Sequence, residues 1–162
     1  MDLNRLTEKS QQALSEAQSS AIRLGHTEVD GEHLLLALLT QPEGLVPRLV
    51  TQAGGDPARL VDELESDLAQ RPRVSGSGLS PGEIRVTRRL AQLLEAAERE
   101  ARQLKDEYVS VEHLVIAFLG ERDDTAAKRS LTSQGITRDG FLGALTAVRG
   151  NQRVTSATPE AA

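Results

Sequence analysis

The chain has 162 residues, a formal net charge of −5 and no cysteine, which excludes disulfides, thiolate zinc sites and cysteine catalysis. Only 2% of the residues are aromatic, which disfavours a β-sandwich or barrel, and the acidic balance disfavours a nucleic-acid partner. The longest apolar runs have six residues, against roughly 20 for a bilayer span, and the first residues lack the apolar core of a secretory signal. We therefore expect a cytoplasmic, helical protein with no membrane partner.

Four helices are predicted in the first half of the chain. Each start carries a residue that favours helix N-termini, and the later ends carry glycine or proline. The helices follow Thr7 and Asp30, cover Leu45–Ala53 before Gly54-Gly55, and run from Asp56-Pro57 to before Pro72. The second helix is apolar all round at Leu34–Leu39, so it should be the buried centre of its unit.

The chain then repeats itself after 80 residues. EHLLLALL at Glu32–Leu39 aligns with EHLVIAFL at Glu112–Leu119, and residues 5–39 and 85–119 are identical at 13 of 35 positions without a gap. A match of this length in one register indicates a duplicated unit. The predicted helices of the second unit are Thr87–Leu104, Ser110–Leu119, Thr125–Ser133 and Thr137–Val148, with Gly135 corresponding to Gly55.

The sequence thus predicts an all-α domain over residues 1–150, made of two pseudo-symmetric four-helix repeats with about eight helices. Repeat 1 covers about residues 5–71 and repeat 2 about 83–149, with a Gly/Ser/Pro-rich linker at 72–82. Residues 151–162 are small and polar, and we expect them to form a solvated, flexible linker within a longer protein.

Signatures of enzyme chemistry are absent. The chain has neither the glycine-rich phosphate loop of nucleotide hydrolases nor a nucleophile elbow. Glu32-His33 and Glu112-His113 recur at the same place in both repeats and could pair across them as metal ligands, but the usual ligand spacing is missing. The two glutamates could also act as acid/base catalysts. Stabilising the dipole at a helix start is the simpler role, favoured for Glu32, while both roles stay open for Glu112.

Two segments carry a resemblance to a known family. LTEKSQQALSEAQSSAIRLGHTEVDGEHLLLALL and, in the second copy, DEYVSVEHLVIAFL resemble the N-terminal repeat domain of Clp ATPases, over Met1 to about Gly150. EGLVPRLVTQAG and VRGNQRVTS resemble the ClpB branch in particular. The phenylalanine-rich beginning of ClpC relatives is missing here.

The resemblance implies a client-binding domain of an AAA+ disaggregase. Such proteins are homohexameric, ATP-dependent stress-response chaperones that work with the DnaK system on unfolded or aggregated polypeptides. ATP and magnesium would be held by ATPase modules outside this chain, which itself would be a monomer without enzyme activity, cofactor or metal.

Family positions in the client-binding groove fall on Thr7, Leu94, Asp106, Glu112 and His113. His113 departs from the family pattern, where leucine is expected. Thr7 is equally a helix cap, and Leu94 is equally a core residue, because Leu14 occupies the same place in repeat 1.

The alternatives are a docking domain of a ClpC- or ClpA-type unfoldase and, in another class, a small hydrolase that uses Glu32 and Glu112. In the ClpC branch these two positions contact phosphorylated arginine, so a recognition role stays open for both.

Overall fold

Eight α-helices follow one another in the computed structural model, which describes residues 1–75, 78–80, 83–150 and 153–159. A short 3-10 helix and two short strands complete the described elements. Their bounds are η1 (Leu3–Arg5), α1 (Glu8–Arg23), β1 (Glu28–Val29), α2 (Gly31–Thr40), α3 (Leu45–Gln52), α4 (Pro57–Ala69), β2 (Arg85–Val86), α5 (Arg88–Gln103), α6 (Val111–Leu119), α7 (Ala126–Ser133) and α8 (Arg138–Arg149). The predicted order of eight helices is confirmed.

The predicted helix starts are also confirmed, because the capping side chains make the expected bonds. The Thr7 hydroxyl accepts the Ser10 N–H, and the Thr87 hydroxyl accepts the Leu90 N–H at the same place in repeat 2. Asp56 caps α4, whose first residue is Pro57. Local sequence therefore sets where these helices begin.

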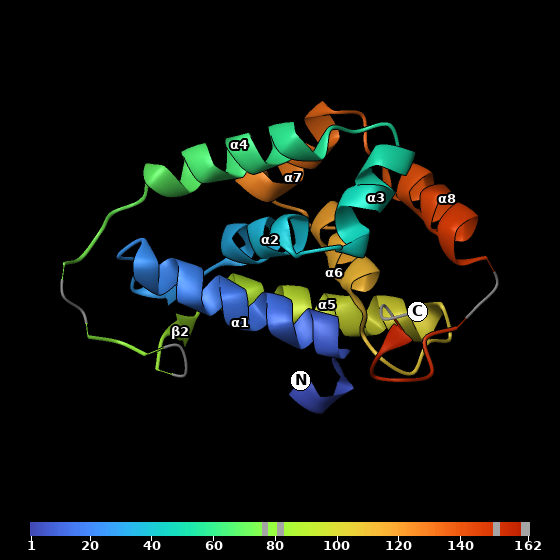
Figure 1. The fold of residues 1–162 in the computed structure, drawn as a ribbon, viewed down its shortest axis with the longest axis horizontal. Coiled ribbons are helices and arrows are strands. Elements are labelled where there is room, and N and C mark those ends of the chain that lie inside the picture. The colour runs from blue at the N-terminus through green and yellow to red at the C-terminus, as the bar shows by residue number, and fades with distance from the viewer. Residues whose placement is uncertain (76–77, 81–82, 151–152, 160–162) are drawn as a thin grey trace.

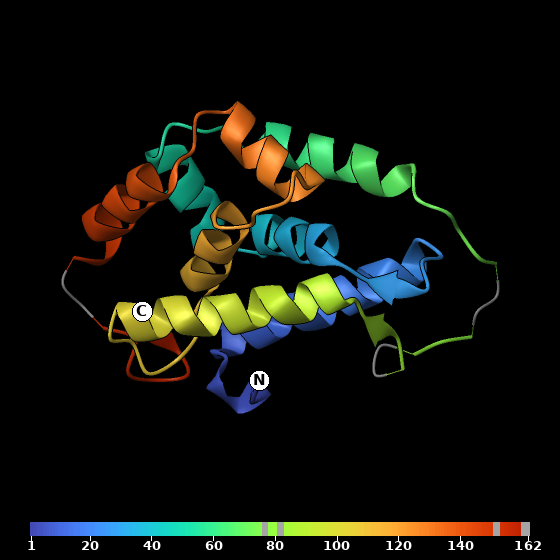
Figure 2. The same ribbon diagram turned by 180° about the vertical axis from the view of Figure 1, so that it is seen from behind.

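The helices form three layers (Figures 1 and 2). In both views α2 and α6 lie in the middle, with α1 and α5 on one side and α3, α4, α7 and α8 on the other. This central position matches their composition, since every residue from Leu34 to Leu39 except Leu36 is buried, as is every residue from Val111 to Phe118. The two longest apolar runs of the chain thus form the shared core of both repeats.

Two strand pairings join the repeats and were not predicted. Strand β1 pairs in parallel with β2, with Glu28 opposite Arg85 and Val29 opposite Val86. At the pseudo-symmetric place Leu6 forms a parallel bridge with Val109. The segment before the first helix of each repeat therefore pairs with the other repeat, which locks the two copies together.

The repeat offset changes along the chain, and this corrects one prediction. The starts of α2 and α6 differ by 80 residues, but those of α3 and α7, and of α4 and α8, differ by 81 because the connection before α7 is longer than that before α3. Gly135 has φ 77°, and its counterpart is Gly54 with φ 94°, not Gly55. A left-handed residue after a helix favours glycine, so the equivalent glycines are those at the helix ends.

The segment after α8 also differs from expectation. Residues 151–152 and 160–162 of the expected solvated linker lie outside the described residues, as do 76–77 and 81–82 of the linker between the repeats. In the described part, Val154 is only 2% exposed, and the Glu107 N–H donates to its carbonyl over 2.8 Å. Part of this segment is therefore packed on the domain instead of being solvated.

Candidate functional site

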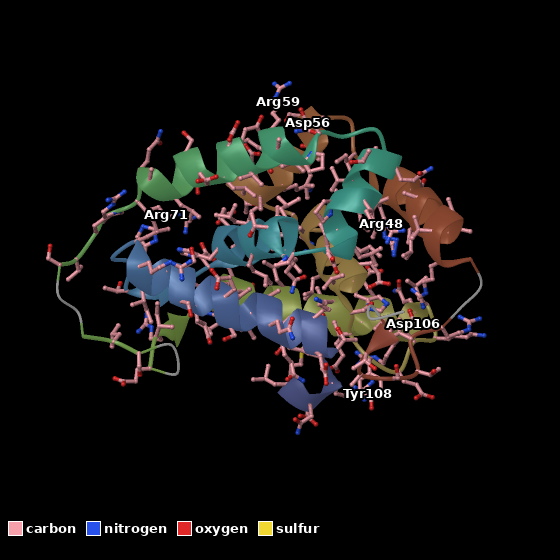
Figure 3. The ribbon with its side chains drawn as sticks, viewed as in Figure 1. Arg48, Asp56, Arg59, Arg71, Asp106 and Tyr108 are labelled. Carbon is pink, nitrogen blue, oxygen red and sulfur yellow. The ribbon has the colours of Figure 1, made fainter. Side chains whose placement is uncertain are left out.

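Two buried clusters of charged side chains surround the starts of α2 and α6, one in each repeat. Each is organised by the histidine in the first helical turn. The N–H of Asp30 donates to His33 Nδ1 over 2.9 Å, and the N–H of Ser110 donates to His113 Nδ1 over 2.9 Å. Because Nδ1 accepts in both rings, the ring proton of each neutral histidine lies on Nε2. Figure 3 shows Arg71 of the first cluster and Asp106 of the second far apart along the long axis of the domain.

In repeat 2 the proton of His113 points to a carboxylate. His113 Nε2 lies 2.7 Å from Asp106 Oδ2, and both side chains are fully buried. The other oxygen of Asp106 accepts the Val154 N–H over 2.8 Å and a bond from Arg149. Burial alone would raise the pKa of Asp106, but the hydrogen bonds from His113, Val154 and Arg149 outweigh it and lower the pKa. Asp106 is thus ionised, and both of its oxygens accept hydrogen bonds.

Glu112 belongs to the same cluster. Its carboxylate accepts a bond from the Ser110 hydroxyl and lies 3.6 Å from Arg149 Nη1. Arg149, with a side chain 14% exposed, therefore bridges Asp106 and Glu112 at the surface of the cluster. We call Asp106, Ser110, Glu112, His113 and Arg149 the repeat-2 cluster.

In repeat 1 a second histidine stands where repeat 2 has Asp106. His33 Nε2 lies 2.8 Å from His26 Nδ1. Burial, then His26 and Arg71, lower the pKa of His33 to about 4, and burial together with Arg71 lowers the pKa of His26. This pair is therefore neutral at physiological pH, whereas repeat 2 has the ionised Asp106 at the place of His26.

Glu32 joins the two repeats by ion pairs. One oxygen accepts from Arg71 Nη2 at 2.5 Å and from Arg89 Nη1 at 2.7 Å, and the other accepts the Ala127 N–H at 3.0 Å. Burial would raise the pKa of Glu32, but the bonds from Arg89 and Ala127 outweigh it and lower the pKa. A carboxylate held ionised by two arginines is a poor general acid or base, so this geometry favours the structural role of Glu32.

The remaining predicted site residues are also buried. Thr7 lies beside the repeat-2 cluster: its N–H donates to the Val109 carbonyl over 3.0 Å, and Ser10 Oγ donates to the same carbonyl over 3.0 Å. Leu94 lies on α5 in the hydrophobic core and is 7% exposed. The structure thus brings Asp106, Glu112 and His113 into direct contact, places Thr7 next to them, and puts Leu94 in the core.

Two hollows lie on the surface at corresponding places of the two repeats. The repeat-1 hollow, of about 410 Å³, is lined chiefly by Leu24, Leu36, Leu68, Glu16, Arg23 and Glu65. The repeat-2 hollow, of about 320 Å³, is lined by Leu104, Leu142, Leu145, Thr146, Arg149, Gly150 and Arg153. The second adjoins the repeat-2 cluster through Arg149, so apolar wall and buried charges meet there.

The arrangement does not resemble a metal centre. Within residues 1–75, 78–80, 83–150 and 153–159, no three or more carboxylate, imidazole or thiol side chains gather in a way that could hold a metal ion. Glu32 and His33 belong to the first cluster and Glu112 and His113 to the second, so the pairing across the repeats that was considered from the sequence is not formed. Over the same residues, no helix is long and apolar enough to cross a bilayer.

Sequence reasoning missed two residues of the repeat-2 cluster and its surroundings. Arg149 is the last residue of α8, and Val154 is the one large aliphatic residue after α8. An apolar residue within an otherwise small and polar segment was a usable signal for Val154. Arg149 gave no such signal, because a basic residue in a last helical turn is common for other reasons.

Comparison with known proteins decides the family. The Clp repeat (R) N-terminal domain family matches residues 5–134. The chain belongs to this family. It is 52% identical over 160 residues to the chaperone protein ClpB of Nitratidesulfovibrio vulgaris, and 46% identical over 161 residues to that of Bacillus cereus. Each alignment covers 99% of this chain but 18% of the relative.

The fold of this Clp repeat domain is also found in solved structures. The Hsp104 N-terminal domain from Candida albicans superimposes with a TM-score of 0.78, covering 94% of this chain and 97% of that one at 24% identity. At this identity the likeness concerns the fold only. The sequence match places the chain with the N-terminal region of ClpB chaperones.

Proposed function

We propose that this Clp repeat domain is the client-binding part of an ATP-dependent disaggregase of the ClpB type. It recognises exposed segments of unfolded or aggregated polypeptide and passes them to an ATPase ring. The observation that carries the proposal is the 52% identity to a ClpB chaperone over 99% of the chain. The proposed context follows from this identity: a cytoplasmic homohexamer that uses ATP and magnesium in other modules and works with DnaK.

The repeat-2 hollow is the proposed contact surface. Leu104, Leu142 and Leu145 give it an apolar wall, and Arg149 connects it to Asp106 and Glu112. A client that buries about 200–300 Å² of apolar surface there gains roughly 5–8 kcal/mol before the cost of association is subtracted. Binding would therefore be weak at one domain, which suits a client that must be pulled away. Several domains on one ring would offset this weakness through effective concentration.

The predicted client-binding residues take a supporting role in this proposal. Asp106, Glu112 and His113 are buried, so they act by fixing Arg149 and the backbone at the rim of the hollow. Thr7 holds the start of α1 against the same region. Leu94 supports α5 from the core.

Binding to a permanently unfolded protein tests the proposal. Reduced, carboxamidomethylated α-lactalbumin is titrated into the isotope-labelled chain, and amide shifts are followed by NMR. We expect shifts around Leu104, Leu142 and Leu145, and none around the repeat-1 hollow. Native α-lactalbumin is the folded control.

Matched substitutions locate the surface. Leu142→Ser should weaken binding severalfold, whereas Leu36→Ser in the repeat-1 hollow should leave it unchanged. Absence of any shift at millimolar unfolded protein would refute the proposal.

A ClpC-type function is the second candidate, through recognition of phosphorylated arginine by Glu32 and Glu112, which occupy the same place in the two repeats. In this chain Arg71 and Arg89 both bond to the carboxylate of Glu32, whereas Arg149 lies 3.6 Å from that of Glu112, so Glu112 is the less tightly paired of the two. A phosphoarginine peptide that binds more tightly than the matching arginine peptide would favour this alternative.

A further inference from the structure

We propose that Arg153–Ala157 occupies a peptide-binding site that extends the repeat-2 hollow beyond Arg153, as an internal substitute for a client segment. This inference rests on the proposed function, because it states how that site recognises a polypeptide and what competes for it. In Figures 1 and 2 the red segment after α8 lies against the C-terminal end of α5 in both views. Its contacts with the domain join it to the repeat-2 cluster and to the start of α1.

The segment is bound mainly through its backbone. The Val154 N–H donates to Asp106 Oδ1 over 2.8 Å, and the Glu107 N–H donates to the Val154 carbonyl over 2.8 Å. Further along, the Glu8 N–H donates to the Ala157 carbonyl over 2.8 Å. Glu8 is the first residue of α1, where an N–H has no partner within the helix. These bonds engage groups that every polypeptide carries, so they fit clients of unrelated sequence.

One side chain adds selectivity. Val154 is 2% exposed, whereas Arg153, Thr155 and Ser156 beside it are exposed. The site therefore accepts a segment with one aliphatic residue and polar neighbours. Large aliphatic side chains are mostly buried in folded proteins and become available when a protein unfolds.

The first repeat provides an internal comparison. Val74 follows α4 much as Val154 follows α8, and its N–H donates to the Gly25 carbonyl over 2.7 Å. Yet Val74 is 49% exposed, and His26 stands at the place of Asp106. Repeat 1 thus lacks both the carboxylate acceptor and the buried aliphatic contact, so the proposed peptide site is specific to repeat 2.

Docking of the chain's own segment lowers the apparent affinity for clients. A site that is free about one-tenth of the time binds about tenfold more weakly than an open one. The substitution Val154→Asp should undock the segment without disturbing the core, because it places a charge in a buried position of a peripheral segment. Thr155→Asp is the matched control, since it adds the same charge at the exposed neighbouring position.

The experiment compares the full chain with these two variants. Amide hydrogen exchange at Glu107 and Glu8 reports docking, and fluorescence anisotropy measures binding of labelled, reduced and carboxamidomethylated α-lactalbumin. We expect Val154→Asp to exchange faster at both amides and to bind the probe at least fivefold more tightly, with Thr155→Asp like the wild type. A synthetic peptide of residues 153–159 should then compete with the probe on Val154→Asp, and the same peptide with aspartate for valine should not.

The outcomes separate this inference from the proposed function. Equal probe binding by the wild type and both variants would overturn the inference and leave the client-binding function in place. Unchanged exchange at Glu107 in Val154→Asp would overturn the docking itself. If no form of the chain binds the probe, both proposals fail.

Discussion

The ion pairs of Glu32 make the strongest stability prediction for this domain. The substitution Glu32→Gln keeps the size of the side chain but removes the charge that faces Arg71 and Arg89. Removing one partner of a buried ion pair typically costs about 3–5 kcal/mol. Both arginines retain other carboxylates, since Arg71 pairs with Asp67 at 3.0 Å and Arg89 with Glu121 at 2.7 Å. We therefore expect the lower end of this range, about 3 kcal/mol.

Urea unfolding followed by circular dichroism measures this loss. In thermal unfolding of a chain of this length, a loss of about 3 kcal/mol corresponds to a fall of roughly 6–12 °C in Tm. The matched variant is Glu112→Gln at the equivalent position of repeat 2, where a single arginine lies 3.6 Å away. It should lose less than Glu32→Gln, because its charge faces one arginine at a longer distance. The reasoning is refuted if Glu32→Gln loses less than 1 kcal/mol or if both variants lose the same amount.

The pH dependence of the same pair of proteins gives an independent check. The pKa of Glu32 is lowered in the folded state, so its contribution is fully present above the pKa of the unfolded chain and is lost as the pH falls through the folded value. The stabilities of the wild type and Glu32→Gln should therefore converge in acid. A constant difference down to pH 2 would contradict the assigned ion pair.

Three further predictions concern single positions. The NMR signals of His33 should titrate near pH 4. Because the unfolded chain takes up this proton near pH 6.5, the free energy of unfolding should fall by up to about 3 kcal/mol as the pH falls from 6.5 to 4. Titration near pH 6.5 in the folded protein would contradict this. Gly54→Ala should cost about 1 kcal/mol through its positive φ, and Gly55→Ala about 1–3 kcal/mol through clashes with Val50 and Ile136, both measured by urea unfolding; a neutral Gly55→Ala would refute the close packing. Thr87→Val removes a helix cap together with a bond to Asp30 and should lower the free energy of unfolding by about 1–2 kcal/mol. The same substitution at the exposed Thr155 should cause no loss.

Helix positions were predictable because their causes are local. The hydroxyl of Thr7 caps a helix three residues away, and Pro57 fits a first turn whatever lies elsewhere in the chain. The apolar runs in α2 and α6 predicted buried helices, because they are apolar on every side. The duplication added a second copy of each signal, which made the fold class and the family accessible from residues alone.

The one error in register has a local cause as well. An ungapped offset of 80 residues fits the chain through α6, where the repeated helix sequence is strongest. The longer connection before α7 then shifts the later helices to 81. Two adjacent glycines in the first repeat hid this shift, since either could match Gly135, and only the backbone angles distinguish Gly54 from Gly55.

The candidate site was predictable in part. Asp106, Glu112 and His113 do meet in one cluster, but their burial could not be read from the sequence, where each is polar. Their desolvation depends on Arg149 and Val154, which lie more than thirty residues away along the chain.

The sequence by itself determined the eight helices, their caps, the duplication and the family, because each depends on residues within a few turns of one another or on direct identity. Only the tertiary structure decided the paired strands, the ion pairs of Glu32 with two arginines and the docking of Val154 beside Asp106. These features join segments that are remote in the chain. Hydrogen bonds and close ion pairs form only where folding brings such segments into direct contact. A residue pattern can show that a charge is present, but only the packed structure shows what it faces.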